Sequence, residues 1–210
     1  MDPEGYQPTA EEMGIEPEAT LTPEVLKNLQ TLEIEAQGEF PETLEALNTT
    51  LGTSMQARPE GYHLTIISPP ESGKLATLSV EQIARLQEIN EAVQKGDGIT
   101  VTGVGYIDGA TAPNIRATDR SKKTSYLAVD IPALKGFREE LGLPEKDFHI
   151  TLGFEAGDIH MQVVGQNEKG KDVLGPMPKK PNPDLGRFVP QEVKFGSISG
   201  QPKQQPAKAV

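Results

Sequence analysis

Two of the three histidines in this 210-residue chain begin the same four-residue pattern, which is His, an apolar residue, Thr and another apolar residue. The copies are HLTI at 63–66 and HITL at 149–152. In a β-strand, residues i and i+2 point to the same face, so His63 lies beside Thr65 and His149 beside Thr151. Two such pairs in one place would supply two proton-transfer groups and two hydroxyl donors around a small anion. We interpret these four residues as candidate catalytic residues that break a phosphodiester by acid–base chemistry, without a metal ion.

The segments that carry the two motifs have the composition of β-strands. Residues 62–68 are apolar and β-branched and end at two prolines, and residues 148–154 alternate apolar and polar side chains. Ser79 and Gln82 form a capping-box pattern at the start of a helix over 79–94. The other predicted strands are 99–107, 126–131, 159–164 and 193–198, and the other predicted helices run from Thr22 to Leu32, over 41–51 and over 132–141.

These elements form two similar half-units, at about 60–107 and 124–165. The first reads strand with motif, helix, strand, and the second reads strand, helix, strand with motif. This order predicts an α+β fold in which helices cover a largely antiparallel sheet. We expect one domain over 21–198, with a long loop rich in Pro, Gly and Lys at 169–190. The acidic residues 1–20 and the Gln-, Pro- and Lys-rich residues 199–210 have little to bury and are expected to be disordered tails.

Charge narrows the choice of partners. The formal net charge is −11 and the isoelectric point is near 4.8. Long duplex nucleic acid is not an expected partner, because phosphate binding depends on clustered Lys and Arg. One local cluster contains Arg116, Arg120, Lys122 and Lys123. From it we take Arg120 as a candidate contact to a small nucleotide or an RNA end, with a solvated loop as the alternative.

The chain contains no cysteine, which excludes disulfides and thiolate metal sites. The first residues lack the apolar centre of a secretory signal, and no apolar run reaches membrane-spanning length. We therefore expect a cytoplasmic protein with no membrane partner and no cofactor. No feature of the sequence specifies the oligomeric state.

The two motifs resemble the paired His-x-Thr signatures of the two-histidine (2H) phosphoesterase superfamily. The longer string HITLGFEAGDIH at 149–160 is similar to the Swiss-army-knife RNA-repair-like branch, and the resemblance covers about residues 60–165. It implies a bilobal fold whose pseudo-symmetric halves each give one motif to a central cleft, with His63, Thr65, His149 and Thr151 as the catalytic residues. It also implies metal-independent hydrolysis of a cyclic phosphate, at an RNA 2′,3′-cyclic end or in a cyclic nucleotide or oligonucleotide.

Three further residues are candidates for binding the substrate. Alternation along the strands at 99–107 and 126–131 places Tyr106 and Tyr126 on the cleft face, where they would stack on a base. Packing at the sheet edge is the alternative for both. If 159–164 forms a hairpin with 148–154, matching their apolar faces places His160 at the rim of the cleft. That position suits a contact to ribose, base or a distal phosphate, and an exposed histidine near a turn with no role is the alternative.

Two other functions remain open at this point. One is a non-catalytic nucleotide-binding module that keeps the cleft. The other is a metallohydrolase that uses His149, Asp158 and His160, for which the sequence offers no second cluster of ligands.

Overall fold

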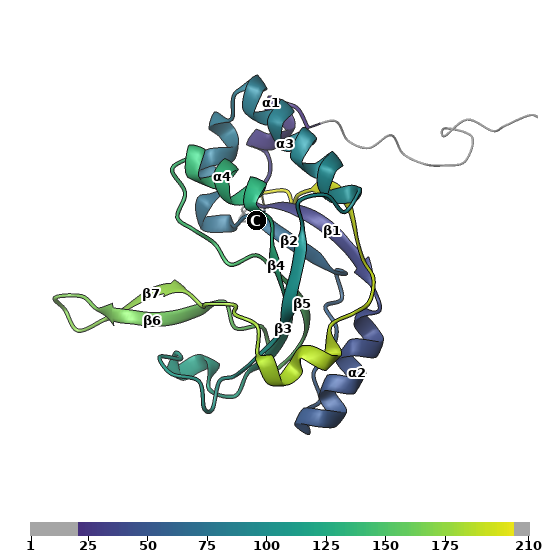
Figure 1. Cartoon of the computed structure of the whole chain (residues 1–210). Coiled ribbons are helices and arrows are strands. Elements are labelled where there is room, and N and C mark those ends of the chain that lie inside the picture. Colours follow the sequence, from purple (N-terminus) through teal and green to yellow (C-terminus); the bar gives the residue numbers. More distant parts are fainter. Residues whose placement is uncertain (1–20, 204–210) are drawn as a thin grey trace, which may run out of the picture.

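The structure is a computed structural model that describes residues 21–203. Its centre is one six-stranded sheet in the order β3-β4-β5-β2-β1-β8, and every pairing within it is antiparallel (Figure 1). The strands are β1 Leu32–Gly38, β2 His63–Ile67, β3 Thr100–Asp108, β4 Lys123–Asp130, β5 His149–Glu155 and β8 Val193–Ser199. The α+β prediction is confirmed, and both predicted half-units contribute to this one sheet.

The two motif-bearing strands are neighbours in the middle of the sheet. β5 lies between β4 and β2, so its backbone is hydrogen-bonded on both edges. The first half runs from β2 through α3 (Val80–Gln94) to β3, and the second runs from β4 through α4 (Pro132–Glu140) to β5. The contact between β2 and β5 therefore joins the two halves where the motifs lie.

Helices and the main core cover one face of the sheet. Leu64, Leu127 and Ile150 lie on three adjacent strands and are fully buried. They belong to one hydrophobic cluster with side chains of α2 (Phe40–Leu51), α3 and α4. Figure 1 shows α3 and α4 near the short α1 (Pro23–Lys27) at one end of the molecule and α2 at the other. With Leu64 and Ile150 directed into this core, the alternate residues of β2 and β5 point to the opposite face.

Several predicted elements are confirmed by the structure. Helix α3 begins as expected, because the Gln82 backbone N–H donates to Ser79 Oγ at 3.2 Å and the Ser79 N–H donates to Gln82 Oε1 at 2.9 Å. Helices α2 and α4 and strands β2, β3, β5 and β8 lie where the pattern predicts them. Three 3₁₀ segments complete the connections, namely η1 Pro69–Thr77, η2 Ala117–Asp119 and η3 Pro183–Phe188.

The predicted helix from Thr22 to Leu32 is wrong. Thr22 does cap a helix, but α1 ends at Lys27 and the chain continues as strand β1. Leu32, Ile34 and Ala36 alternate along β1 and are all buried, as on one face of a strand. Pairing with β2 and β8 on its two edges outweighs the helical spacing of the apolar residues before it.

The predicted hairpin between 148–154 and 159–164 is also wrong. Strand β6 (Met161–Gln166) pairs instead with β7 (Asp172–Pro176), which lies inside the segment expected to be a loop. Both edges of β5 are already occupied by β2 and β4, so β6 has no edge of β5 to join. The β6–β7 hairpin projects from the body of the molecule (Figure 1). We call it the arm.

The boundary expected at residue 199 lies too early. Beyond β8, the Gln30 N–H donates to the Gln201 carbonyl, the Gln201 N–H donates to Thr31 Oγ1, and the Lys203 N–H donates to the Asn28 carbonyl. Residues 200–203 are thus attached to the segment before β1. The expected tail at 1–20 and residues 204–210 lie outside the described residues. Within residues 21–203, no helix combines the length and apolar character needed to cross a membrane.

Candidate active site

The structure brings the two motifs side by side. Leu64 on β2 is paired with Ile150 on β5 in an antiparallel ladder. This register places His63 next to Thr151 and Thr65 next to His149, so the two His-Thr pairs are arranged crosswise. All four side chains belong to the face opposite the helices. The pairing of β2 with β5 thus brings the two motifs together on the sheet itself.

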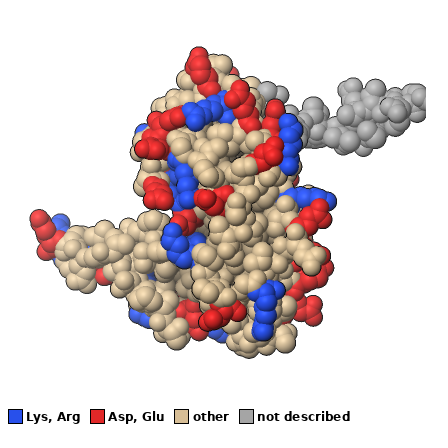
Figure 2. All heavy atoms as spheres, in the orientation of Figure 1, with Lys and Arg blue, Asp and Glu red and all other residues tan. Residues whose placement is uncertain are grey.

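A cleft of about 650 Å³ lies over this face of the sheet. His63, Thr65, His149 and His160 line it, so four of the eight predicted site residues share one cavity. One wall comes from η1, the end of α4 and the loop before β5, and the other from the base of the arm and residues 176–180. In Figure 2, basic side chains lie between the helical part and the projecting arm, with acidic side chains beside them.

His149 has one ring nitrogen committed to the backbone. Its Nδ1 lies 3.1 Å from the Asp147 carbonyl oxygen, which can only accept, so Nδ1 carries the proton of the neutral ring. Nε2 is then the unprotonated nitrogen. Burial, followed by the nearby Lys179 ammonium, lowers the pKa of His149 to about 3. The ring is therefore neutral at pH 7 and has the form of a general base.

His63 has a different environment. Its Nε2 lies 3.2 Å from an Nη of Arg58 and 3.6 Å from Glu33 Oε2. Burial lowers the pKa of His63, while the Glu33 carboxylate works in the opposite direction and favours the charged ring. The Glu33 carboxylate thus opposes the lowering of the His63 pKa, whereas the Lys179 ammonium adds to the lowering of the His149 pKa.

Thr151 is placed differently from the expectation. Its side chain is buried, it is not among the residues that line the cleft, and its hydroxyl donates to Asp158 Oδ2 at 3.0 Å. The proton expected to bind a phosphate oxygen is therefore held by a carboxylate. Thr65 remains in the cleft lining, so the two threonines differ in role despite their matching motifs.

Asp158 organises the floor behind His149. Besides Thr151, its carboxylate lies 3.5 Å from His160 Nε2 and 3.6 Å from Lys179 Nζ. Burial works to raise the pKa of Asp158, but Lys179, His160 and the Thr151 hydrogen bond outweigh it and lower the pKa to about 2. The ionised carboxylate thus connects Thr151 of the second motif with Lys179, in the segment 176–180 that forms part of the cleft wall.

His160 lies at the cleft as expected, although the predicted hairpin does not exist. It directly precedes β6, its side chain is exposed, and the Met177 N–H donates to its carbonyl at 2.9 Å. His160 lies in the short segment between β5 and the arm, which also contains Asp158, and this segment leads to the cleft.

The two tyrosines do not lie together on the cleft face. Tyr106 is paired with Ser125, which places it on the opposite side of the sheet from Tyr126, where it packs against the main core. A β-bulge between Val101 and Gly103 shifts the alternation of β3 and is the reason that the expectation for Tyr106 is wrong.

Tyr126 is on the expected face but is closed off from a ligand. It is 3% exposed, its hydroxyl donates to the Lys180 carbonyl at 2.7 Å, and its ring meets the His149 ring edge to face at 5.9 Å between centroids. The Lys179 Nζ lies 4.8 Å from the ring centroid. Tyr126 therefore supports His149 from behind and offers no free face to a base.

Arg120 and the basic cluster around it lie outside the cleft lining. Arg120 is exposed and its guanidinium donates to the Gly109 and Ala112 carbonyls. Its neighbours are neutralised locally, since Lys122 pairs with Asp119 at 2.7 Å and Lys123 with Glu155 at 3.1 Å. The cluster stabilises its own loop, as in the alternative interpretation.

Four charged residues of the cleft lining that shift the pKa of His63 or His149 were not predicted from the sequence. They are Glu33, Arg58, Lys146 and Lys179. Glu33 lies on β1, directly after the helix that the sequence predicted to end at Leu32. The other three residues lie in loops with no motif around them. Strand alternation along β1 is the one signal that would have found Glu33.

Metal binding has no matching cluster in the described part of the chain. Within residues 21–203, no group of three His, Cys, Asp or Glu side chains is placed to hold a metal ion, and His149, Asp158 and His160 form no such group.

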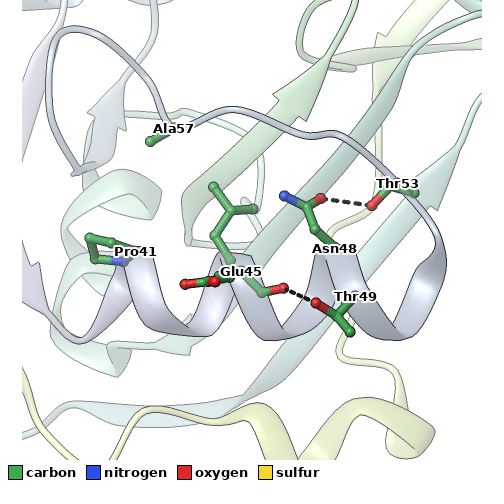
Figure 3. Close-up of a pocket in the computed structure, with 7 residues that line it drawn as sticks. Pro41, Glu45, Asn48, Thr49, Thr53 and Ala57 are labelled. Carbon is green, nitrogen blue, oxygen red and sulfur yellow. Dashed lines mark hydrogen bonds between the residues drawn. The ribbon is translucent and has the colours of Figure 1, made fainter.

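A second hollow lies beside α2, away from the motifs (Figure 3). Its polar groups are already used within the protein. Asn48 Oδ1 accepts from Thr53 Oγ1 at 2.8 Å, and the Thr49 hydroxyl donates to the Glu45 carbonyl at 3.0 Å. These bonds fasten the turn after α2, so the hollow is a packing feature of that turn.

Comparison with known proteins gives one match. A family model described as Swiss Army Knife, 2H phosphoesterase domain, matches residues 32–160. That range begins with β1 and ends at His160, so it includes both motifs and Asp158. No curated protein and no solved structure matches the chain.

Proposed function

The chain belongs to the 2H phosphoesterase superfamily, in its Swiss Army Knife branch, and on this premise we propose that it hydrolyses a cyclic phosphate on a small nucleotide or an RNA end. The family supports a phosphodiesterase-type activity in general. The cyclic substrate and the roles of individual residues are our inference from the cleft.

The crosswise arrangement of the two His-Thr pairs over the cleft carries the proposal. A phosphodiester between His63 and His149 would have one imidazole on each side, so one can take a proton from the attacking water while the other gives a proton to the leaving oxygen. Neither task requires a metal ion. In a cyclic phosphate, the leaving oxygen stays attached to the product.

His149 is the better candidate for the base. Its Nδ1–H bond to the Asp147 carbonyl orients the ring, and its low pKa keeps Nε2 free to accept a proton. Water attacks phosphorus and transfers its proton to Nε2. The Tyr126 ring, packed edge to face against the imidazole, limits how the ring can turn.

His63 is then the acid. Glu33 stabilises the imidazolium at 3.6 Å, and this ring protonates the ribose oxygen as the phosphorus–oxygen bond breaks. Thr65 donates to a non-bridging oxygen, and the Arg58 guanidinium beside His63 balances the negative charge that grows there. His149 then releases its proton to solvent and His63 takes one up from solvent, which restores both rings for the next cycle.

The size and charge of the cleft favour a small ligand. Its volume of about 650 Å³ lies within the range of roughly 300–1,000 Å³ of small-molecule sites. The chain as a whole is strongly acidic, which disfavours a long polyanion, while Arg58, Lys146 and Lys179 bring positive charge to this one place. A nucleotide with a cyclic phosphate meets both conditions.

The test is a substrate panel with matched histidine variants. The purified protein is incubated with 2′,3′- and 3′,5′-cyclic mononucleotides, cyclic oligonucleotides and RNA with a 2′,3′-cyclic end, and the products are analysed by mass. Wild type should add one water to at least one of these substrates. His63→Ala and His149→Ala should each lower kcat by about 100-fold or more, because each ring has a separate proton to transfer.

His160→Ala is the comparison variant on the same cleft. It should raise KM modestly and lower kcat far less than His149→Ala, since His160 lies at the rim. Tight binding of a cyclic nucleotide without turnover would support the non-catalytic alternative. Turnover that survives loss of either motif histidine would contradict the paired mechanism.

A further inference from the structure

Lys146 differs from the other cations that line the cleft. It lies in the loop before β5, three residues ahead of His149. Arg138 pairs with Glu71 at 2.6 Å, Lys180 with Asp147 at 2.6 Å, Lys179 with Asp158 at 3.6 Å and Arg58 with Glu60 at 3.8 Å. Among the residues that the structure describes, none forms a hydrogen bond or an ion pair with the Lys146 ammonium. Lys179 Nζ also lacks a hydrogen-bond partner but has the Asp158 carboxylate beside it, so Lys146 is the cation of the described cleft lining without an ion pair.

The backbone on both sides of Lys146 is held in place. Before it, an Arg138 Nη donates to the Pro144 carbonyl at 2.9 Å, and Arg138 itself is 2% exposed and donates to the Ile66 carbonyl on β2. After it, the Asp147 carboxylate accepts from the Lys179 N–H and from Lys180 Nζ, while its carbonyl accepts from His149. Lys146 is thus fixed between two anchored residues, which limits the reorganisation needed to hold a ligand.

The electrostatic surroundings keep Lys146 charged near neutral pH. Burial lowers its pKa to about 8, while the Glu71 and Glu33 carboxylates favour the ammonium form. Glu71 is already saturated by Arg138 and by the Ser68 N–H and hydroxyl. Lys146 in turn contributes to the low pKa of His149, so its charge acts on the proposed base.

The two motifs offer fewer donors to a phosphate than the sequence predicted, and Lys146 can supply a further one. Thr151 gives its proton to Asp158, so of the two motif hydroxyls only that of Thr65 is open to a phosphate oxygen. A phosphoryl group that gains negative charge in the transition state needs more than one donor. A partly buried ammonium supplies more stabilisation than a hydroxyl, because charge-assisted hydrogen bonds are roughly twice as strong as neutral ones.

We propose that Lys146 is a further catalytic residue of this cleft, whose ammonium contacts the non-bridging oxygens of the scissile phosphate and neutralises the charge they gain. This role rests on the proposed function. Lys146 stays protonated throughout the reaction, and proton transfer remains with His63 and His149. The ammonium contact adds to those proposed for Thr65 and Arg58, which line the same cleft.

The first experiment measures anion binding without turnover. Sulfate is titrated into wild type, Lys146→Gln, Lys146→Arg and the control Lys171→Gln by calorimetry at pH 6 and pH 9; sulfate keeps its charge over this range. Lys171 is an exposed lysine between β6 and β7, outside the cleft lining. At pH 6, Lys146→Gln should bind sulfate at least about ten-fold more weakly than wild type, and Lys171→Gln should match wild type.

The difference in pH dependence between wild type and Lys146→Arg isolates Lys146, because Lys179 in the same cleft also has a lowered pKa. Wild-type affinity for sulfate should fall between pH 6 and pH 9, as Lys146 loses its proton with a pKa of about 8. Lys146→Arg should lose less affinity over this range than wild type, because a guanidinium stays charged. A wild-type affinity that Lys146→Gln leaves unchanged would overturn the assignment.

The second experiment measures turnover on the substrate found by the panel. Lys146→Gln should lower kcat by about ten-fold or more, and Lys146→Arg should restore most of it. Weaker sulfate binding with an unchanged kcat would make Lys146 a binding residue and overturn its catalytic role. If wild type cleaves no cyclic phosphate, the proposed function fails and the catalytic role falls with it, whereas the sulfate titrations still decide whether Lys146 binds an anion.

Discussion

His63 and His149 occupy equivalent places in matching motifs, yet their neighbours give them different properties. His149 is buried beside an ammonium, and its Nδ1 is used by a carbonyl. His63 lies beside a carboxylate and a guanidinium. The division of labour that we propose between base and acid therefore rests on residues outside the motifs.

The pH profile of kcat/KM follows from these two rings. The base must be neutral, and the low pKa of His149 leaves it neutral down to about pH 3. The acid must be protonated, and the pKa of His63 lies below its usual 6.5, so its protonated fraction falls as the pH rises through that lowered value. We expect kcat/KM of the free enzyme to be highest on the acid side of pH 6.5. A pH–rate series from pH 3.5 to 9 measures this, and a maximum above pH 7 would contradict the assignment.

At the scale of the elements, β5 and the arm differ in how much of the rest of the protein supports them. β5 is paired on both edges and lies over the main core. Among the described residues, the two strands of the arm pair only with each other, and the Val163 N–H donates to the Asn114 carbonyl. Val164, Val173 and Leu174 on the arm are 57%, 42% and 40% exposed. A lone two-stranded hairpin is marginally stable in water, so the arm depends on its base, where Ile159 is fully buried.

Shortening the arm tests this description. Val163 and Leu174 are directly paired, so replacing residues 164–173 with Asn-Gly leaves a hairpin closed by a two-residue turn. The melting temperature should stay within about 3 °C of wild type, because the removed residues bury little apolar surface. Ile159→Ala is the matched control at the base and should cost about 2–4 kcal/mol of unfolding free energy. If the shortened protein lost as much stability as the control, the arm would be part of the core.

Alternation and capping patterns predicted most of the helices and strands, but they could not predict which strands pair with one another. The Ser79 cap, the β2 and β5 strands and the common face of His63 and Thr65 follow from local spacing, which the fold preserves. The hairpin proposed for His160 failed because periodicity shows which residues share a face and not which strand lies alongside. Tyr106 failed because a bulge, which depends on the neighbouring strand, shifts the pattern by one residue. The loop cations Lys146 and Lys179 carry no local signal.

At the scale of the whole molecule, the two ends of the described chain hold each other. Residues 200–203 run beside the segment between α1 and β1, with a bridge between Leu29 and Pro202. Gln201 and Thr31 also line the cleft, so this junction forms part of its wall. The chain carries a net charge of −11, while Lys146, which has no ion pair among the described residues, lies inside the cleft.

Two truncations measure what the junction contributes. A chain that ends after Lys203 keeps the four hydrogen bonds of residues 201–203, and a chain that ends after Gly200 loses them while β8 stays complete. At about 1 kcal/mol for each bond, the shorter chain should melt about 5 °C or more below the longer one. Differential scanning calorimetry of both proteins gives the comparison. Equal melting temperatures would show that these bonds add nothing to folding.

The position of β5 between β2 and β4 also determines how the active site can fail on heating. A site on loops can loosen while the rest of a protein stays folded, and activity is then lost before structure. Here the two histidines lie on interior strands that separate only when ladders on both sides break. Thermal inactivation should therefore coincide with global unfolding, and the amide protons of Leu64 and Ile150 should be among the slowest in the molecule to exchange with solvent.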